Sequence, residues 1–78
     1  MKIHVFAALK DFMPSEFELV DSSVTNINEM KEILKLKFPN AEKLIDSCRF
    51  STEHEILSFD QEIKNYENIF VIPPSSGG

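Results

Sequence analysis

The sequence predicts an α+β domain in which one helix covers one face of a mixed sheet of about four to five strands. Three observations favour this class: apolar and polar residues alternate near the start, a single helical pattern follows, and several short β-rich runs come last. A chain of 78 residues has room for one hydrophobic core. Its hydrophobic content of 42%, with seven Phe, is ample for a folded domain and argues against disorder.

The first two elements are predicted to pair as a β-hairpin. The stretch KIHVFAAL, residues 2–9, alternates and so predicts a strand. One face of this strand would carry Ile3, Val5, Ala7 and Leu9, and the other Lys2, His4, Phe6 and Ala8. Pro14 prevents regular continuation, and EFELVD, residues 16–21, alternates as a second strand before a turn at residues 21–23.

One amphipathic helix is predicted over TNINEMKEILKLKF, residues 25–38. Its apolar side would carry Ile27, Met30, Ile33, Leu34 and Phe38. Asn26 and Glu29 have the spacing of an N-cap and its capping-box partner. Pro39 disfavours helical geometry at the residue before it, which ends the helix.

The rest of the chain predicts one helical turn and three short strands. AEKLIDS, residues 41–47, is long enough for a single turn, and the β-rich runs are CRF, EIL and NIFVI, ending at Ile72. A hairpin, one covering helix and further strands form the β-grasp arrangement of ubiquitin-like domains. We therefore expect a β-grasp domain over residues 1–72 and a flexible tail over residues 73–78.

Composition excludes several classes of function. Eight basic and 13 acidic residues give a net charge of −5, which disfavours nucleic acid and favours a partner with a basic surface. The only cysteine, Cys48, allows no intrachain disulfide and is expected to be a small buried apolar residue. His4 and His54 lack a metal-ligating cluster and are expected on the surface. With no convincing signal peptide or membrane-spanning run, we expect a cytoplasmic protein without a membrane partner.

The uncovered face of the sheet is a candidate partner surface. Phe6, Phe70 and Ile72 point away from the helix if the alternating set points toward it. That set is Ile3, Val5, Leu9, Ile69 and Val71. Three large apolar residues on one open face favour a docking surface. Single exposed apolar residues are nevertheless ordinary in small proteins.

The end of the chain is the second candidate site. Gly77 and Gly78 are the only glycines, and they follow Pro73-Pro74-Ser75-Ser76. A double glycine has no side chain and can enter a narrow cleft fully extended, and the prolines hold the base of the tail away from the sheet. A plain flexible terminus is the alternative.

These residues resemble a known family. SFDQEIKNYENIFVIPPSSGG, residues 58–78, is similar to the MoaD/ThiS ubiquitin-like sulfur carriers, and its Pro-Pro-x-x-Gly-Gly ending to the small subunits of molybdopterin synthase in particular. The similarity extends more weakly through the first strand and LKDF, residues 9–12. Tyr66-Glu67 stands where the family usually has a Gly-Asp turn, and Glu53 where it often has Asn in the preceding hairpin.

The resemblance implies a mechanism centred on Gly78. A ubiquitin-activating-type adenylyltransferase would adenylate its carboxylate, and a persulfide donor would convert the adenylate to a thiocarboxylate. The tail would then enter the large subunit of molybdopterin synthase and give sulfur to cyclic pyranopterin monophosphate, for the dithiolene that holds molybdenum. ATP and magnesium would belong to the activating partner, and this chain would bind no cofactor or metal. The family assembly is a heterotetramer of two small and two large subunits, and the catalytic side chains would belong to the large subunit.

The resemblance also assigns docking residues. By position, Phe6, Ile56 and Ile72 match apolar contact sites of the family, and Lys10 matches a frequent Arg. Other readings of the sequence remain: a carrier for thiamine synthesis or tRNA thiolation, a modifier joined through Gly78 to lysines, or an interaction module with an inert tail.

Overall fold

The computed structural model describes residues 1–20, 24–63 and 66–74, and its central feature is a five-stranded sheet. The strands are β1 (Lys2–Val5), β2 (Glu16–Glu18), β3 (Arg49–Ser51), β4 (Ile56–Leu57) and β5 (Asn68–Ile72). Their order across the sheet is β2-β1-β5-β3-β4. The predicted α+β class with a mixed sheet is confirmed, and the arrangement is that of a β-grasp fold.

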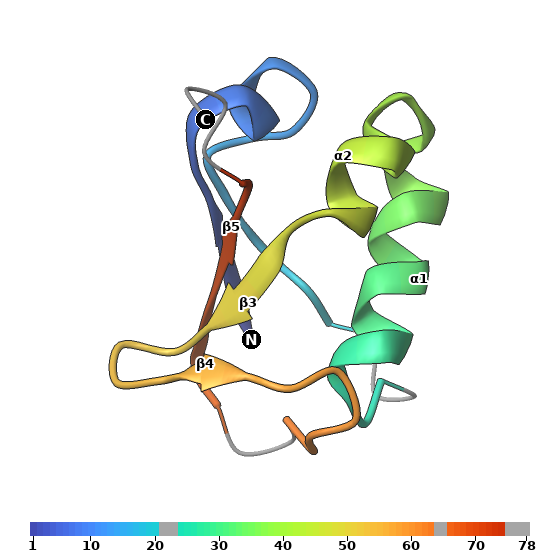
Figure 1. The fold of residues 1–78 in the computed structure, drawn as a ribbon. Coiled ribbons are helices and arrows are strands. Elements are labelled where there is room, and N and C mark those ends of the chain that lie inside the picture. Colours follow the sequence, from blue (N-terminus) through green and yellow to red (C-terminus); the bar gives the residue numbers. More distant parts are fainter. Residues whose placement is uncertain (21–23, 64–65, 75–78) are drawn as a thin grey trace.

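The two central strands come from opposite ends of the chain. β1 and β5 run parallel, with Ile3 opposite Ile69 and Val5 opposite Val71. The other three pairings, β1–β2, β3–β5 and β3–β4, are antiparallel. Because β1 and β5 run in the same direction, their carboxyl ends lie side by side, as Figure 1 shows.

One main helix, α1 (Ile27–Lys37), covers one face of this sheet (Figure 1). Asn26 is its N-cap, and its side-chain oxygen accepts a hydrogen bond from the Glu29 backbone at 2.9 Å. The Glu29 carboxylate accepts bonds from the backbone and hydroxyl of Thr25, which lowers the pKa of Glu29. The Glu29 carboxylate thus bonds to Thr25, the residue that precedes the N-cap. The helix ends at Lys37, as Pro39 predicts.

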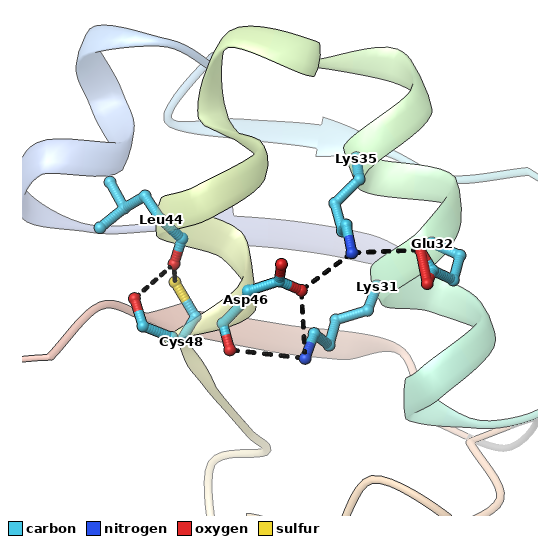
Figure 2. A network of polar contacts seen from close by, with 7 residues as sticks. Lys31, Glu32, Lys35, Leu44, Asp46 and Cys48 are labelled. Atoms are coloured by element: carbon cyan, nitrogen blue, oxygen red, sulfur yellow. Dashed lines mark hydrogen bonds and ion pairs between the residues drawn. The ribbon is translucent and has the colours of Figure 1, made fainter.

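A second, short helix continues the helical layer. The 3₁₀ turn η2 (Pro39–Ala41) leads into α2 (Glu42–Asp46), in the segment for which one helical turn was predicted. Lys35 of α1 lies 2.9 Å from the Asp46 carboxylate, and Lys31 lies 3.6 Å from it (Figure 2). The hydrogen bond with Lys35 is the main cause that lowers the pKa of Asp46. These contacts hold the end of α2 against α1.

The core lies between the helices and the inner face of the sheet. Its largest fully buried side chains include Phe50, Ile3, Leu9, Ile27, Met30, Leu34, Ile45, Ile63 and Ile69. Burying such side chains contributes about 1.5–3 kcal/mol each, which is why a short chain can fold around them.

The first strand is shorter than the sequence predicts. β1 ends at Val5, and residues Ala7–Asp11 form a 3₁₀ helix, η1. Ala7 has φ of 54°, in the left-handed region, and it is exposed, so the prediction that it shares a strand face with Ile3 and Val5 is wrong. Leu9 is buried as predicted, but from η1 and not from a strand. Alternation of apolar and polar residues cannot distinguish a strand that continues to Leu9 from a 3₁₀ helix, because Leu9 is buried in both arrangements.

Candidate functional site

The root of the tail lies at the end of a central strand. β5 ends at Ile72, Pro73 is half-buried and Pro74 is exposed. Neither proline has a backbone N–H, so neither can donate a ladder hydrogen bond to a neighbouring strand. The remaining predicted tail residues, Ser75, Ser76, Gly77 and Gly78, lie outside the described residues.

The sheet face opposite the helices carries the predicted apolar side chains. In β5, Ile69 and Val71 are fully buried while the residues between them, Phe70 and Ile72, alternate to the other face. Ile72 is 39% exposed, beside the tail root. We call this the open face (Figure 1).

The strand registers extend this face across the whole sheet. Residues directly opposite one another project to the same side, so one row runs across it: Glu16, His4, Phe70, Ser51 and Ile56. At 60% exposure, Ile56 is the most exposed apolar residue of this row. The predicted docking residues of β4 and β5 therefore do share a face.

Phe6 and Lys10 lie where β1 gives way to η1. The Phe6 ring is 40% exposed and its centroid is 5.9 Å from that of Phe70, so Phe6 joins the open face. Lys10 is exposed in η1, which lies beside the end of β5 (Figure 1). Within the described residues, no hydrogen bond or ion pair is recorded for the Lys10 ammonium group.

A polar cluster at the centre of this face escaped the sequence analysis. The His4 ring stacks on Phe70 at 4.8 Å, and its Nε2 is 2.9 Å from Asn68 Oδ1. Its Nδ1 is 3.4 Å from the Glu16 carboxylate. His4 was expected on the surface, and its side chain is half-buried there, with 21% of it exposed. The alternation of residues in the first strand places His4 and Phe6 on the same face. It cannot predict the contact between His4 and Asn68, which are 64 positions apart.

The turn before β5 is anchored by Tyr66. Its hydroxyl accepts a hydrogen bond from Gln61 Nε2 at 3.1 Å, and its backbone N–H donates to the Ile63 carbonyl at 3.3 Å. Tyr66 also packs against the core. Asn65, the residue before Tyr66, lies outside the described residues. These contacts fix the start of β5 and so place the cluster around His4.

The hairpin between β3 and β4 is held by a threonine. The Thr52 hydroxyl accepts hydrogen bonds from the backbones of His54 and Glu55, both at 3.2 Å. Glu53 and His54 are exposed in this turn, so the prediction that His54 is a surface residue is confirmed. Thr52 therefore supplies the local turn bonds that Asn or Ser often supplies.

Cys48 is buried and poorly suited to nucleophilic chemistry. Its Sγ donates a hydrogen bond to the Leu44 carbonyl at 3.1 Å (Figure 2). Burial raises the pKa of the Cys48 thiol to about 11, against a weak opposing effect of Lys31. Since the thiolate is the reactive form, the predicted apolar role of Cys48 agrees with its environment.

Metal-binding clusters and membrane-spanning helices are both absent from the described residues. Within residues 1–20, 24–63 and 66–74, no group of three or more His, Cys, Asp and Glu side chains could hold a metal ion. In the same ranges, none of the helices has the length and apolar character needed to cross a bilayer.

The fold and site together define a class: a ubiquitin-like β-grasp domain whose central strand runs into a tail beside an open apolar face. A family model described as the ThiS family matches residues 3–78, and the chain belongs to this family. No curated protein matched the chain. Membership implies a sulfur-carrier role in which the chain works with partner enzymes of sulfur transfer.

Proposed function

We propose that this chain is the sulfur carrier of molybdopterin synthase, its small subunit. One observation carries the proposal: β5 ends at the open face and continues directly into Pro73 and Pro74, with Ser-Ser-Gly-Gly following in the sequence. A partner that covers this face would meet the start of the tail. The Pro-Pro-x-x-Gly-Gly ending favours the molybdopterin branch of the family over the thiamine branch.

The proposed reaction takes place at the carboxylate of Gly78. A carboxylate is a poor electrophile, because its leaving group would be oxide. An adenylyltransferase of the ubiquitin-activating type transfers AMP from ATP to this carboxylate, with release of pyrophosphate. A persulfide sulfur then displaces AMP, and reductive cleavage of the remaining sulfur–sulfur bond by a thiol leaves a thiocarboxylate at Gly78. Magnesium and ATP are bound by the partner.

In the second half of the cycle the thiocarboxylate gives up its sulfur. The large subunit binds the open face through Phe6, Ile56, Phe70 and Ile72, with Lys10 as a polar contact beside the tail root. Ser75, Ser76, Gly77 and Gly78 extend into its active site, where no Cβ of the final glycines obstructs the approach. Sulfur passes to cyclic pyranopterin monophosphate, and two carrier turnovers supply the two sulfurs of one product. A cytoplasmic heterotetramer of two small and two large subunits is part of the proposal.

Intact mass spectrometry tests the carrier chemistry. Protein isolated from its own cells should include a species heavier by the difference between sulfur and oxygen, and removal of Gly77 and Gly78 should abolish it. The matched control replaces Ser75 and Ser76 by Ala, which keeps the length and the terminal glycines. A ladder of heavier adducts on other proteins would instead identify a protein modifier.

A reconstitution distinguishes the acceptors. The thiocarboxylated chain is mixed with the large subunit of molybdopterin synthase and cyclic pyranopterin monophosphate, and in parallel with the thiazole-forming enzyme of thiamine synthesis. Molybdopterin formation in the first mixture alone is expected. Sulfur transfer in the second mixture alone would contradict the molybdopterin assignment and leave the carrier role intact.

A further inference from the structure

The strongest unexplained feature is the group of polar atoms around the His4 ring. Both ring nitrogens face oxygen atoms: Nε2 faces Asn68 Oδ1 at 2.9 Å, and Nδ1 faces a Glu16 carboxylate oxygen at 3.4 Å. A neutral imidazole carries one N–H and can donate to only one of them, whereas an imidazolium donates to both. An imidazolium at His4 would therefore bond to both oxygens at once.

The charged groups around His4 are few. From β2, Glu16 lies directly opposite His4, and Glu18 lies two residues further on, where the chain's amino group binds it at 3.2 Å. From β1, Lys2 shares the face two residues away. The β5 neighbours are Asn68 and Phe70, neither of which titrates. The contact with Glu16 is thus the nearest ionic interaction recorded for His4.

Docking on the open face changes the environment of this pair. His4 lies in the row between Glu16 and Phe70, and the Glu16 side chain is 56% exposed in the free chain. A partner seated over Phe70 and the tail root would remove water from this carboxylate. Burying an unpaired carboxylate is costly, and a hydrogen-bonded cation beside it offsets much of that cost. An imidazolium at His4 supplies that cation from within the chain.

We propose that His4 and Glu16 form an ion pair beneath the docked partner enzyme, so that docking on the open face is linked to the uptake of a proton by His4. The occupant is an enzyme of sulfur transfer, because the tail that such an enzyme must receive begins at Pro73, directly after Ile72 of this face. The inference rests on the docking surface proposed above.

Calorimetric titration tests the proton linkage. The full-length chain is titrated with the adenylyltransferase, which every branch of sulfur-carrier chemistry requires, at pH 6, 7 and 8 and in buffers of different ionisation enthalpy. If docking favours protonated His4 about tenfold, binding should tighten as the pH falls from 8 to 6, by at most that factor. The enthalpy should vary with the buffer, reporting proton uptake on binding.

Three variants isolate the contribution of His4. His4→Gln removes the imidazole, and Glu16→Gln removes the carboxylate. Each should abolish most of this pH dependence. His54→Gln is the matched control, because His54 is exposed in the β3–β4 turn. It should retain the dependence of the unaltered chain. Circular dichroism of each variant checks that the fold is kept.

The outcomes separate this inference from the proposed function. An unchanged pH dependence in His4→Gln would overturn the ion pair, and so would the absence of binding at every pH. Dimerisation of the free chain that Ile72→Asp abolishes would place a second copy on the open face and overturn it as well. Binding to the adenylyltransferase without binding to the large subunit of molybdopterin synthase would contradict only the proposed function.

Discussion

Cys48 should be almost inert toward alkylating reagents in the folded protein, and this bears on where the transferred sulfur comes from. Its side chain is 2% exposed and donates to the Leu44 carbonyl. Burial raises the pKa of the thiol from 9.0 to about 11. This increase of about two pKa units lowers the thiolate fraction at pH 8 about a hundredfold relative to an ordinary thiol. Steric exclusion of the reagent slows the reaction further. The persulfide that supplies sulfur should therefore reside on another protein.

The assay is alkylation by iodoacetamide at pH 8, followed by mass spectrometry. The native chain should react at least about a hundredfold more slowly than the same chain in denaturant, where Cys48 is an ordinary thiol. Cys48→Ala should retain thiocarboxylate formation at Gly78. Native labelling within about tenfold of the denatured rate would refute the reasoning, and loss of thiocarboxylate in a folded Cys48→Ala variant would route sulfur through this residue.

The raised pKa of Cys48 also has a consequence for stability. A thiol that ionises less readily in the folded state contributes stability that is fully present below pH 9 and is lost as the pH rises toward 11. The two-unit shift corresponds to about 3 kcal/mol over that interval. Urea denaturation between pH 8 and 11 should show this loss in the unaltered chain and a smaller one in Cys48→Ala. Equal losses in both would contradict the assignment.

Three further perturbations test the local structure and the docking surface. Ala7→Gly should stabilise the fold by about 0.5–1 kcal/mol in urea denaturation, because φ of 54° strains a residue with a Cβ. Ala8→Gly is the control and should not stabilise it. Destabilisation by Ala7→Gly would contradict the left-handed geometry. Ile72→Asp should weaken partner binding in calorimetry at least about tenfold, while Leu36→Asp, at a 78% exposed site on α1, should not; equal losses would remove the open face as the docking surface. The free energy of unfolding of the unaltered chain should exceed that of Glu29→Gln by a constant amount above pH 4.5. This difference should shrink as the pH falls, because hydrogen bonds from Thr25 lower the pKa of Glu29. A difference that persists at pH 2 would contradict those bonds.

Much of the fold follows from local chemistry, and the sequence predicts it for that reason. The alternation of residues in β1 and β5, the Asn26 cap and the Pro39 stop each depend on neighbours within a few positions. The ends of the helices and strands are predicted less closely than their existence. The predicted helix over residues 25–38 spans Ile27–Lys37, and the second strand, predicted over residues 16–21, spans Glu16–Glu18. Terminal residues lack partners within their own element, so tertiary contacts decide them.

The tail and the apolar side of the candidate site were also evident from sequence. Gly77 and Gly78 can be recognised without any tertiary contact, because their proposed role depends only on the absence of a side chain. Phe70 and Ile72 follow from a period of two in a single strand. The bend at Ala7 did not follow, since an alanine in left-handed geometry contradicts local propensity and is held there by the fold around it.

Only the tertiary structure assembled the cluster at the centre of the open face. Parallel pairing of β1 with β5 brings His4 onto Phe70 and Asn68, and antiparallel pairing with β2 brings Glu16 to its other ring nitrogen. No local pattern encodes contacts between residues 64 positions apart, because strand pairing is chosen by the burial of the whole sheet against α1. The sequence by itself determined where the double glycine of the proposed reaction lies, at residues 77 and 78. The fold decided that a histidine and a glutamate lie side by side on the open face.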